Sequence, residues 1–67
     1  MSSPVESASA ELAAIADNVD QYRQRVGGLA DRFAGSDRDD LVTAIHEAER
    51  LLRSAERGLI RAIRLTR

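Results

Sequence analysis

Few side chains in this sequence could perform acid–base chemistry. The single histidine, His46, precedes Glu47 and lies four residues before Arg50. Catalysis by such a histidine needs a nucleophile and a group that orients the imidazole. The sequence offers no candidate for either role, so we interpret His46 as a surface or interface residue.

Metal chemistry is equally poorly supported. Asp37, Asp39 and Asp40 cluster where a helix should begin, but a calcium loop needs alternating ligands over about twelve residues and a terminal bidentate glutamate. With no cysteine and one histidine, a structural zinc site and disulfides are excluded. The sequence therefore predicts a non-enzymatic protein with no catalytic residue, no cofactor and no metal site.

Five arginines near the C-terminus recur at intervals of three and four residues, which places them on one strip of a helix. Such a strip could bind nucleic acid or another acidic partner. It has neither an aromatic residue for base stacking nor a recognition helix, so a solvated face is the favoured interpretation. The Arg strip consists of Arg50, Arg53, Arg57, Arg61 and Arg64.

The length and composition favour association. A chain of 67 residues makes one domain, residues 1–67, and buries little surface of its own. Small domains gain stability from disulfides, metals or association, and only association is left here. One Phe, one Tyr and no Trp in a 43% hydrophobic chain suit helix packing better than an aromatic-lined pocket.

Charge and hydropathy indicate in which cellular compartment the protein resides. The net charge is -1, and every basic residue is arginine, which we interpret as the bias of a high-GC, actinobacterial-like genome. No stretch reaches the roughly 18 apolar residues of a membrane span, and the N-terminus lacks a basic start and an apolar run. We expect a soluble, cytoplasmic protein.

The first half of the chain has the pattern of one long helix. Ser3-Pro4-Val5-Glu6 supplies a capping serine, a proline at the first helical position and a glutamate three residues after the cap. A heptad repeat follows, which predicts a helix over about residues 4–34. Gly27-Gly28 interrupts it and predicts a bend or the close approach of a facing helix. The repeat comprises Val5, Ala8, Leu12, Ile15, Val19, Tyr22, Val26, Leu29 and Phe33.

A short turn and a second helix follow. Gly35 is a natural left-handed cap, and Ser36 with Asp39 has the spacing of a second capping box. These signals predict a turn at 35–36 and a helix over about residues 37–65. A connection this short forces antiparallel neighbours, which places the acidic residues 1–20 beside the Arg-rich residues 50–67.

The apolar stripe of the second helix is broader than one partner helix can cover, because Ala44, Leu51 and Leu65 widen it. The predicted fold class is all-α: two long antiparallel helices that form a hairpin, which pairs with a second copy into a four-helix bundle. The predicted interface residues are Leu12, Ile15, Val19, Tyr22, Val26, Leu41, Ile45, Leu51, Leu52, Leu59 and Ile63.

The turn also carries a family resemblance. Phe33-Ala34-Gly35, between two helices of an Ala- and Arg-rich chain, resembles the Trp-x-Gly turn of the small WXG-type proteins exported by type VII secretion systems. The resemblance implies a helical hairpin that pairs as a homodimer or heterodimer.

The leading hypothesis is a protein–protein interaction module, a homodimerising hairpin whose outer faces are left for a larger protein partner. Two alternatives stay open. One is a small nucleic-acid-associated regulator that uses the Arg strip, and the other is a type VII secreted WXG-like protein.

Overall fold

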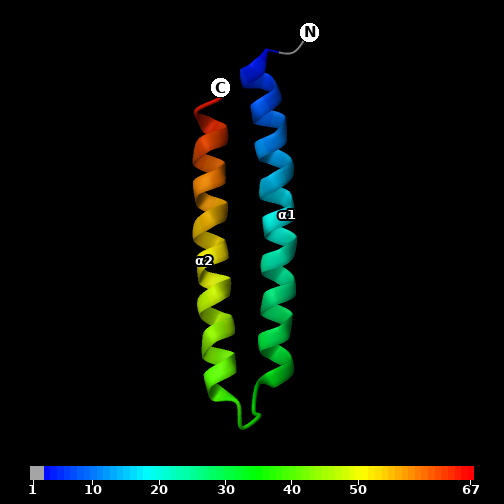
Figure 1. Ribbon diagram of the computed structural model, residues 1–67, viewed down its shortest axis with the longest axis vertical. Helices are drawn as coiled ribbons and strands as arrows, with labels where there is room; N and C mark the ends of the chain where they lie inside the picture. The colour runs from blue at the N-terminus through cyan, green and yellow to red at the C-terminus, as the bar shows by residue number, and fades with distance from the viewer. Residues whose placement is uncertain (1–2) are drawn as a thin grey trace.

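The protein is a helical hairpin (Figure 1). The computed structural model describes residues 3–67, in which α1 spans Pro4–Phe33 and α2 spans Asp39–Arg64. The two helices run antiparallel and pack along their whole length, and these residues contain no strand. The molecule measures 55 × 16 × 11 Å. The all-α hairpin predicted from the sequence is thus confirmed.

The start of α1 is the capping box that the sequence indicates. The Glu6 backbone N–H donates to Ser3 Oγ at 3.1 Å, and the Ser3 backbone N–H donates to Glu6 Oε2 at 3.3 Å. Pro4 occupies the first helical position, where its missing N–H leaves no helical hydrogen bond unmade. Local chemistry therefore fixes this end of the hairpin.

The connection is longer than predicted. α1 ends at Phe33, α2 begins at Asp39, and Gly35 takes the left-handed conformation with φ 80°. The Ser36 hydroxyl donates to the Phe33 carbonyl at 2.7 Å and accepts from the Arg38 backbone N–H at 3.2 Å. Ser36 thus closes the turn.

The second capping box is consequently wrong. The residue at the N-cap of α2 is Arg38, and its side chain makes no capping hydrogen bond. Asp39 and Asp40 lie in the first turn of α2, where negative charge suits the helix dipole.

The helices meet along a seam of half-buried residues spaced three and four apart. Among residues 3–67 only Ala30, at 1% exposed, is fully buried. In α1 the seam consists of Ser9, Leu12, Ala16, Val19, Arg23, Val26, Ala30 and Phe33. On the other side it consists of Val42, Ile45, Glu49, Leu52, Glu56, Leu59 and Ile63 of α2 and of Thr66, which follows the end of α2.

The seam differs in part from the predicted heptad. It keeps Leu12, Val19, Val26 and Phe33, and Val5 lies in line with them but is 54% exposed. The other predicted positions in α1 lie to one side, and Tyr22 is 56% exposed instead of packed in the core. Their places are taken by small side chains and by Arg23, which is tolerated because it pairs with Glu56 of α2. In α2, Glu49 and Glu56 likewise occupy the seam, next to Ala48 and Ala55, which lie to one side of it.

α1 continues without a break through Gly27-Gly28. A Cβ atom added to Gly27 would lie 2.8 Å from Glu49 Oε2, whereas one added to Gly28 would meet nothing within 4 Å. The close approach of the facing helix is therefore confirmed for Gly27 alone. Within residues 3–67, neither helix has the length and apolar character needed to cross a membrane.

Candidate interaction surface

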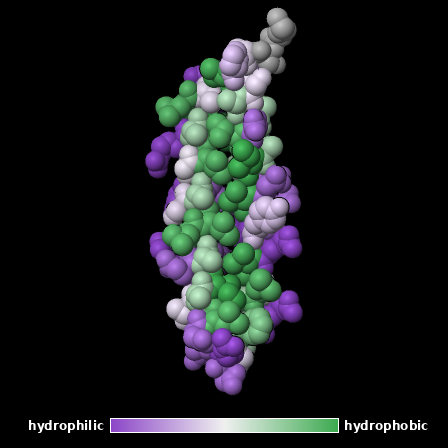
Figure 2. Space-filling model, in the orientation of Figure 1, coloured by the Kyte–Doolittle hydropathy of each residue, from purple (hydrophilic) through white to green (hydrophobic). Residues whose placement is uncertain are grey.

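One side of the hairpin carries exposed apolar side chains along both helices. Ala8, Ile15, Tyr22 and Leu29 of α1 each lie four residues before a seam residue, and so do Ala48, Ala55 and Ala62 of α2. An antiparallel pair has a local two-fold axis, so positions with the same offset from the seam lie on the same side. Figure 2 shows an apolar band that covers both helices on this side.

A second row of α2 widens the band. Ala44, Leu51, Gly58 and Leu65 each directly precede a seam residue, on the same side as Ala48 and Ala55. Leu51 is 55% exposed and Leu65 is 83% exposed, while Ile15 and Leu29 are each 40% exposed. We call the α1 and α2 residues of both rows the apolar face.

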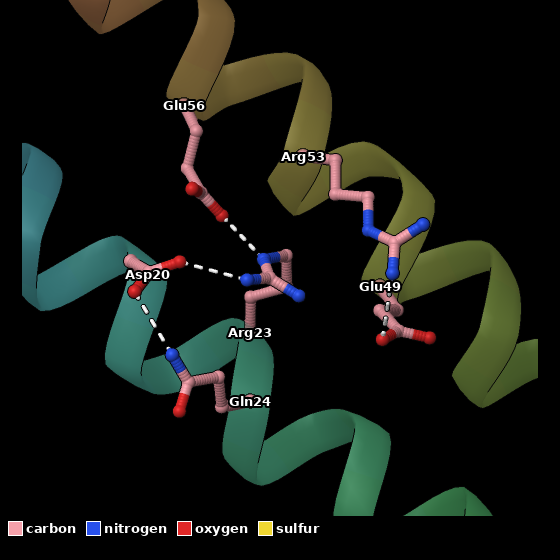
Figure 3. Close-up of polar contacts among 6 residues, drawn as sticks. All are labelled: Asp20, Arg23, Gln24, Glu49, Arg53 and Glu56. Atoms are coloured by element: carbon pink, nitrogen blue, oxygen red, sulfur yellow. Dashed lines mark hydrogen bonds and ion pairs between the residues drawn. The ribbon is translucent and has the colours of Figure 1, made fainter.

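The opposite side is mainly polar, although Ile60 is 44% exposed there. Toward this side, an ion-pair cluster lies in the middle of the seam (Figure 3). Arg23 Nε donates to Glu56 Oε1 at 2.7 Å, and its Nη2 donates to Asp20 Oδ1 at 2.7 Å. Gln24 Nε2 donates to the second oxygen of Asp20 at 2.9 Å. The side chains of Arg23 and Glu56 are each 20% exposed, so the helices enclose this pair.

Electrostatics within the cluster favour the charged forms. The hydrogen bond from Arg23 holds the pKa of Asp20 below its usual value. The pKa of Arg23 is raised by its hydrogen bonds to Asp20 and Glu56. Arg23–Glu56 is the single ion pair that joins the helices in the described part of the chain. The cluster therefore fixes the register of α1 against α2 along the hairpin axis.

This cluster was missed by the sequence analysis. Arg23, Glu49 and Glu56 fall at three-and-four spacing with the seam leucines and valines, and an arginine facing two glutamates was the available signal. Because the strip that contains Ile15, Tyr22 and Leu29 is more hydrophobic, it was predicted to face the other helix instead.

The Arg strip lies on the solvent side of α2. All five of its arginines are exposed, and Arg50 and Arg53 pair with Glu47 and Glu49 of their own helix. Arg50 lowers the pKa of Glu47. Arg61 and Arg64 make no ion pair with the residues that the structure describes. Nucleic-acid binding by this strip stays a prediction.

His46 and Asp40 each pair with a residue close to them in the sequence. His46 Nδ1 is 3.6 Å from Glu49 Oε1. Asp40 pairs with Arg38 at 3.1 Å, and the hydrogen bond from Arg38 lowers its pKa. Residues 3–67 contain no group of three or more side chains that could hold a metal ion. A hollow beside Gly28, bordered by Arg25, Leu29 and Arg32, is lined by α1 alone.

The predicted interface residues fall into two groups. Ile15, Tyr22 and Leu51 lie exposed on the apolar face. The others are half-buried between the helices: Leu12, Val19, Val26, Leu41, Ile45, Leu52, Leu59 and Ile63. The structure thus assigns the second group to the hairpin itself and leaves the first group largely exposed.

Reversing the charge of Arg23 should destabilise the hairpin. Arg23→Glu would place a third carboxylate beside Asp20 and Glu56, whose present distances to Arg23 are 2.7 Å. We expect the midpoint of thermal unfolding to fall clearly, and the double variant Arg23→Glu/Glu56→Arg to recover part of the loss. Circular dichroism at one protein concentration measures both.

Arg50→Glu is the matched control, since the Arg50–Glu47 pair is exposed at 62% and 55% and exposed pairs contribute little. Equal effects of Arg23→Glu and Arg50→Glu would contradict a structural role for the cluster.

Comparison with known proteins adds no functional assignment. No family model matches the chain, and no curated protein or solved structure matches it. The resemblance of the Phe33-Ala34-Gly35 turn to WXG-type proteins therefore stays a prediction.

Proposed function

We propose that this protein is a non-enzymatic interaction module that homodimerises through the apolar face into a four-helix bundle. The observation that carries the proposal is the missing core: in residues 3–67, Ala30 alone is fully buried. A folded domain of this size needs buried apolar surface to offset the conformational entropy of ordering its chain. A second hairpin laid on the apolar face would supply it.

The exposed area has the size that a dimer requires. The hairpin exposes 5149 Å², whereas a compact monomer of 7.3 kDa would expose about 4,200 Å². The excess is about 950 Å², close to the roughly 800 Å² that each partner contributes to a standard interface. The hairpin thus exposes enough additional surface for one interface of standard size.

The edges of the apolar face favour a second copy of this chain. The α1 edge carries Glu11, Arg25 and Arg32, and the α2 edge carries Asp40, Glu47 and Arg61. Each edge thus bears both signs of charge, and the net charge of -1 produces little repulsion between two copies. Arg61 lies at the edge of this face, whereas the other arginines of the Arg strip, Arg50, Arg53, Arg57 and Arg64, lie outside it and would stay free for a larger partner.

Mass and unfolding measured against concentration test the proposal. Sedimentation equilibrium should give twice the 7.3 kDa chain mass at micromolar concentration. The midpoint of thermal unfolding should rise with concentration, because dimerisation stabilises the folded state by mass action. A stable folded monomer with a constant midpoint would rule out the homodimer, and so would a chain that stays unfolded alone at high concentration.

A further inference from the structure

Two arrangements can bring the apolar faces of two copies together with two-fold symmetry. In one, the axis runs along the hairpin, both turns lie at the same end, and α1 of each copy packs on α2 of the other. In the other, the axis runs across the hairpin, the turns lie at opposite ends, and each helix packs on its own counterpart. We propose that the copies pair with their turns at the same end; this inference rests on the proposed homodimer.

The two helices contribute side chains of different size to the apolar face. Its first row in α1 holds Ile15, Tyr22 and Leu29, each seven residues from the next, and all are at least 40% exposed. The matching row in α2 begins with the half-buried Leu41 next to the turn and continues with Ala48, Ala55 and Ala62, again seven residues apart. α1 therefore presents a row of large side chains to a second copy, and α2 presents a row that consists mainly of small ones.

Contacts across the seam show which residues of α1 and α2 lie at the same position along the hairpin axis. Arg23 contacts Glu56, and a Cβ atom on Gly27 would contact Glu49. In an antiparallel pair the two residue numbers of facing residues have a nearly constant sum, which is 79 and 76 for these pairs, so residues whose numbers add up to about 77 face each other. Such pairs are Ile15 with Ala62, Tyr22 with Ala55, and Leu29 with Ala48.

In the same-end arrangement each large side chain of α1 faces an alanine of the other copy. By the same sum, Leu51 lies between Tyr22 and Leu29, and Leu65 lies between Ala8 and Ile15. The large residues of α2 therefore enter the gaps between those of α1. Interdigitation of this kind gives the packing density of a protein core.

The opposite-end arrangement packs poorly. α1 would face α1, so the row of Ile15, Tyr22 and Leu29 would meet the same bulky row of the other copy. α2 would face α2, so the alanines would meet alanines and leave voids. The edge charges suit both arrangements, because each edge is acidic toward one end and basic toward the other. Side-chain size is what distinguishes them.

Spin-label distances test the arrangement directly, because the chain contains no cysteine. Asp37→Cys places a label in the turn, and Gln21→Cys places one near the middle of α1, outside the apolar face. We expect a distance between the two turn labels below half of the 55 Å hairpin length. A distance near that full length would overturn the inference but leave the dimer intact.

The Gln21→Cys label separates that result from failure of the dimer. Its two copies lie near the middle of the bundle in both arrangements, so a measurable distance there reports dimer formation alone. No distance from either label, together with the mass of a single chain, would contradict the proposed function.

Substitutions that exchange a small and a large side chain across the interface test the arrangement without a spin label, which could itself perturb the dimer. Ala55→Leu should raise the dissociation constant at least about tenfold, because the added side chain meets Tyr22 of the other copy and overpacks the interface. Adding Tyr22→Ala should restore most of the affinity. In the opposite-end arrangement Ala55→Leu would fill the void between the two α2 helices and tighten the dimer instead.

Discussion

Replacing Leu52 with aspartate is expected to abolish the cooperative unfolding transition. Leu52 is half-buried in the middle of the seam, and no Arg–carboxylate pair joins the helices elsewhere than at Arg23 in the described residues. An unpaired carboxylate placed there loses hydration as well as apolar contacts, a loss of about 3–5 kcal/mol. A chain of this length has only about 3–10 kcal/mol of stability in total.

Circular dichroism and urea titration measure this effect. Ser54→Asp is the matched control, because Ser54 is exposed two residues away on the side of α2 that points away from the seam. We expect Ser54→Asp to unfold like the wild type within about 0.5 kcal/mol. A Leu52→Asp variant that keeps a sharp transition would show that α2 does not use this face to pack on α1.

The helices and their approximate limits follow from local signals that act without tertiary structure. Ser3, Pro4 and Glu6 define the start of α1, and Gly35 supplies the left-handed residue of the turn. Ser36 was misread because its hydroxyl can either cap a following helix or bind the end of the preceding one. Its distances to Phe33 and Arg38 show the second use.

The choice of face could not be predicted in the same way. Leu12, Val19 and Val26 fit two overlapping heptads, one completed by Ile15 and Tyr22 and the other by Ala16 and Arg23. Hydropathy favours the heptad with Ile15 and Tyr22. The observed heptad instead places small residues and the Arg23 side chain, whose charge is paired, between the helices, and the small residues let the two backbones approach. Only the pairing of Arg23 with Glu56 distinguishes the two, and that pairing joins residues from opposite halves of the chain.

The largest apolar side chains of the protein are not all placed between its two helices. A sequence that served only the hairpin would place its largest apolar residues in the seam, yet Tyr22, Leu51 and Leu65 lie outside it. Arginine and glutamate take up seam positions instead. Five of the exposed large apolar residues, Ile15, Tyr22, Leu29, Leu51 and Leu65, lie on the face that the proposed second hairpin would cover, whereas Val5 and Ile60 lie elsewhere. The two-heptad pattern is therefore what the proposed four-helix assembly would require.

Leu51→Asp should separate assembly from hairpin packing. Leu51 neighbours Leu52 in the chain but lies on the apolar face, where it is 55% exposed. Aspartate there costs the single hairpin little. In the dimer it would be buried without a partner, so the dissociation constant should rise at least about 100-fold, or roughly 2.7 kcal/mol.

Sedimentation equilibrium across a concentration series measures that change. Thr43→Asp is the control, because it adds the same charge to an exposed position of α2 outside the apolar face. We expect Thr43→Asp to dimerise like the wild type, and Leu51→Asp to sediment as one chain at concentrations where the wild type is paired. Since the lone hairpin lacks a core, Leu51→Asp should also unfold at a lower temperature that no longer depends on concentration. If Leu51→Asp dimerised with unchanged affinity, the interface would have to lie on another face of the hairpin.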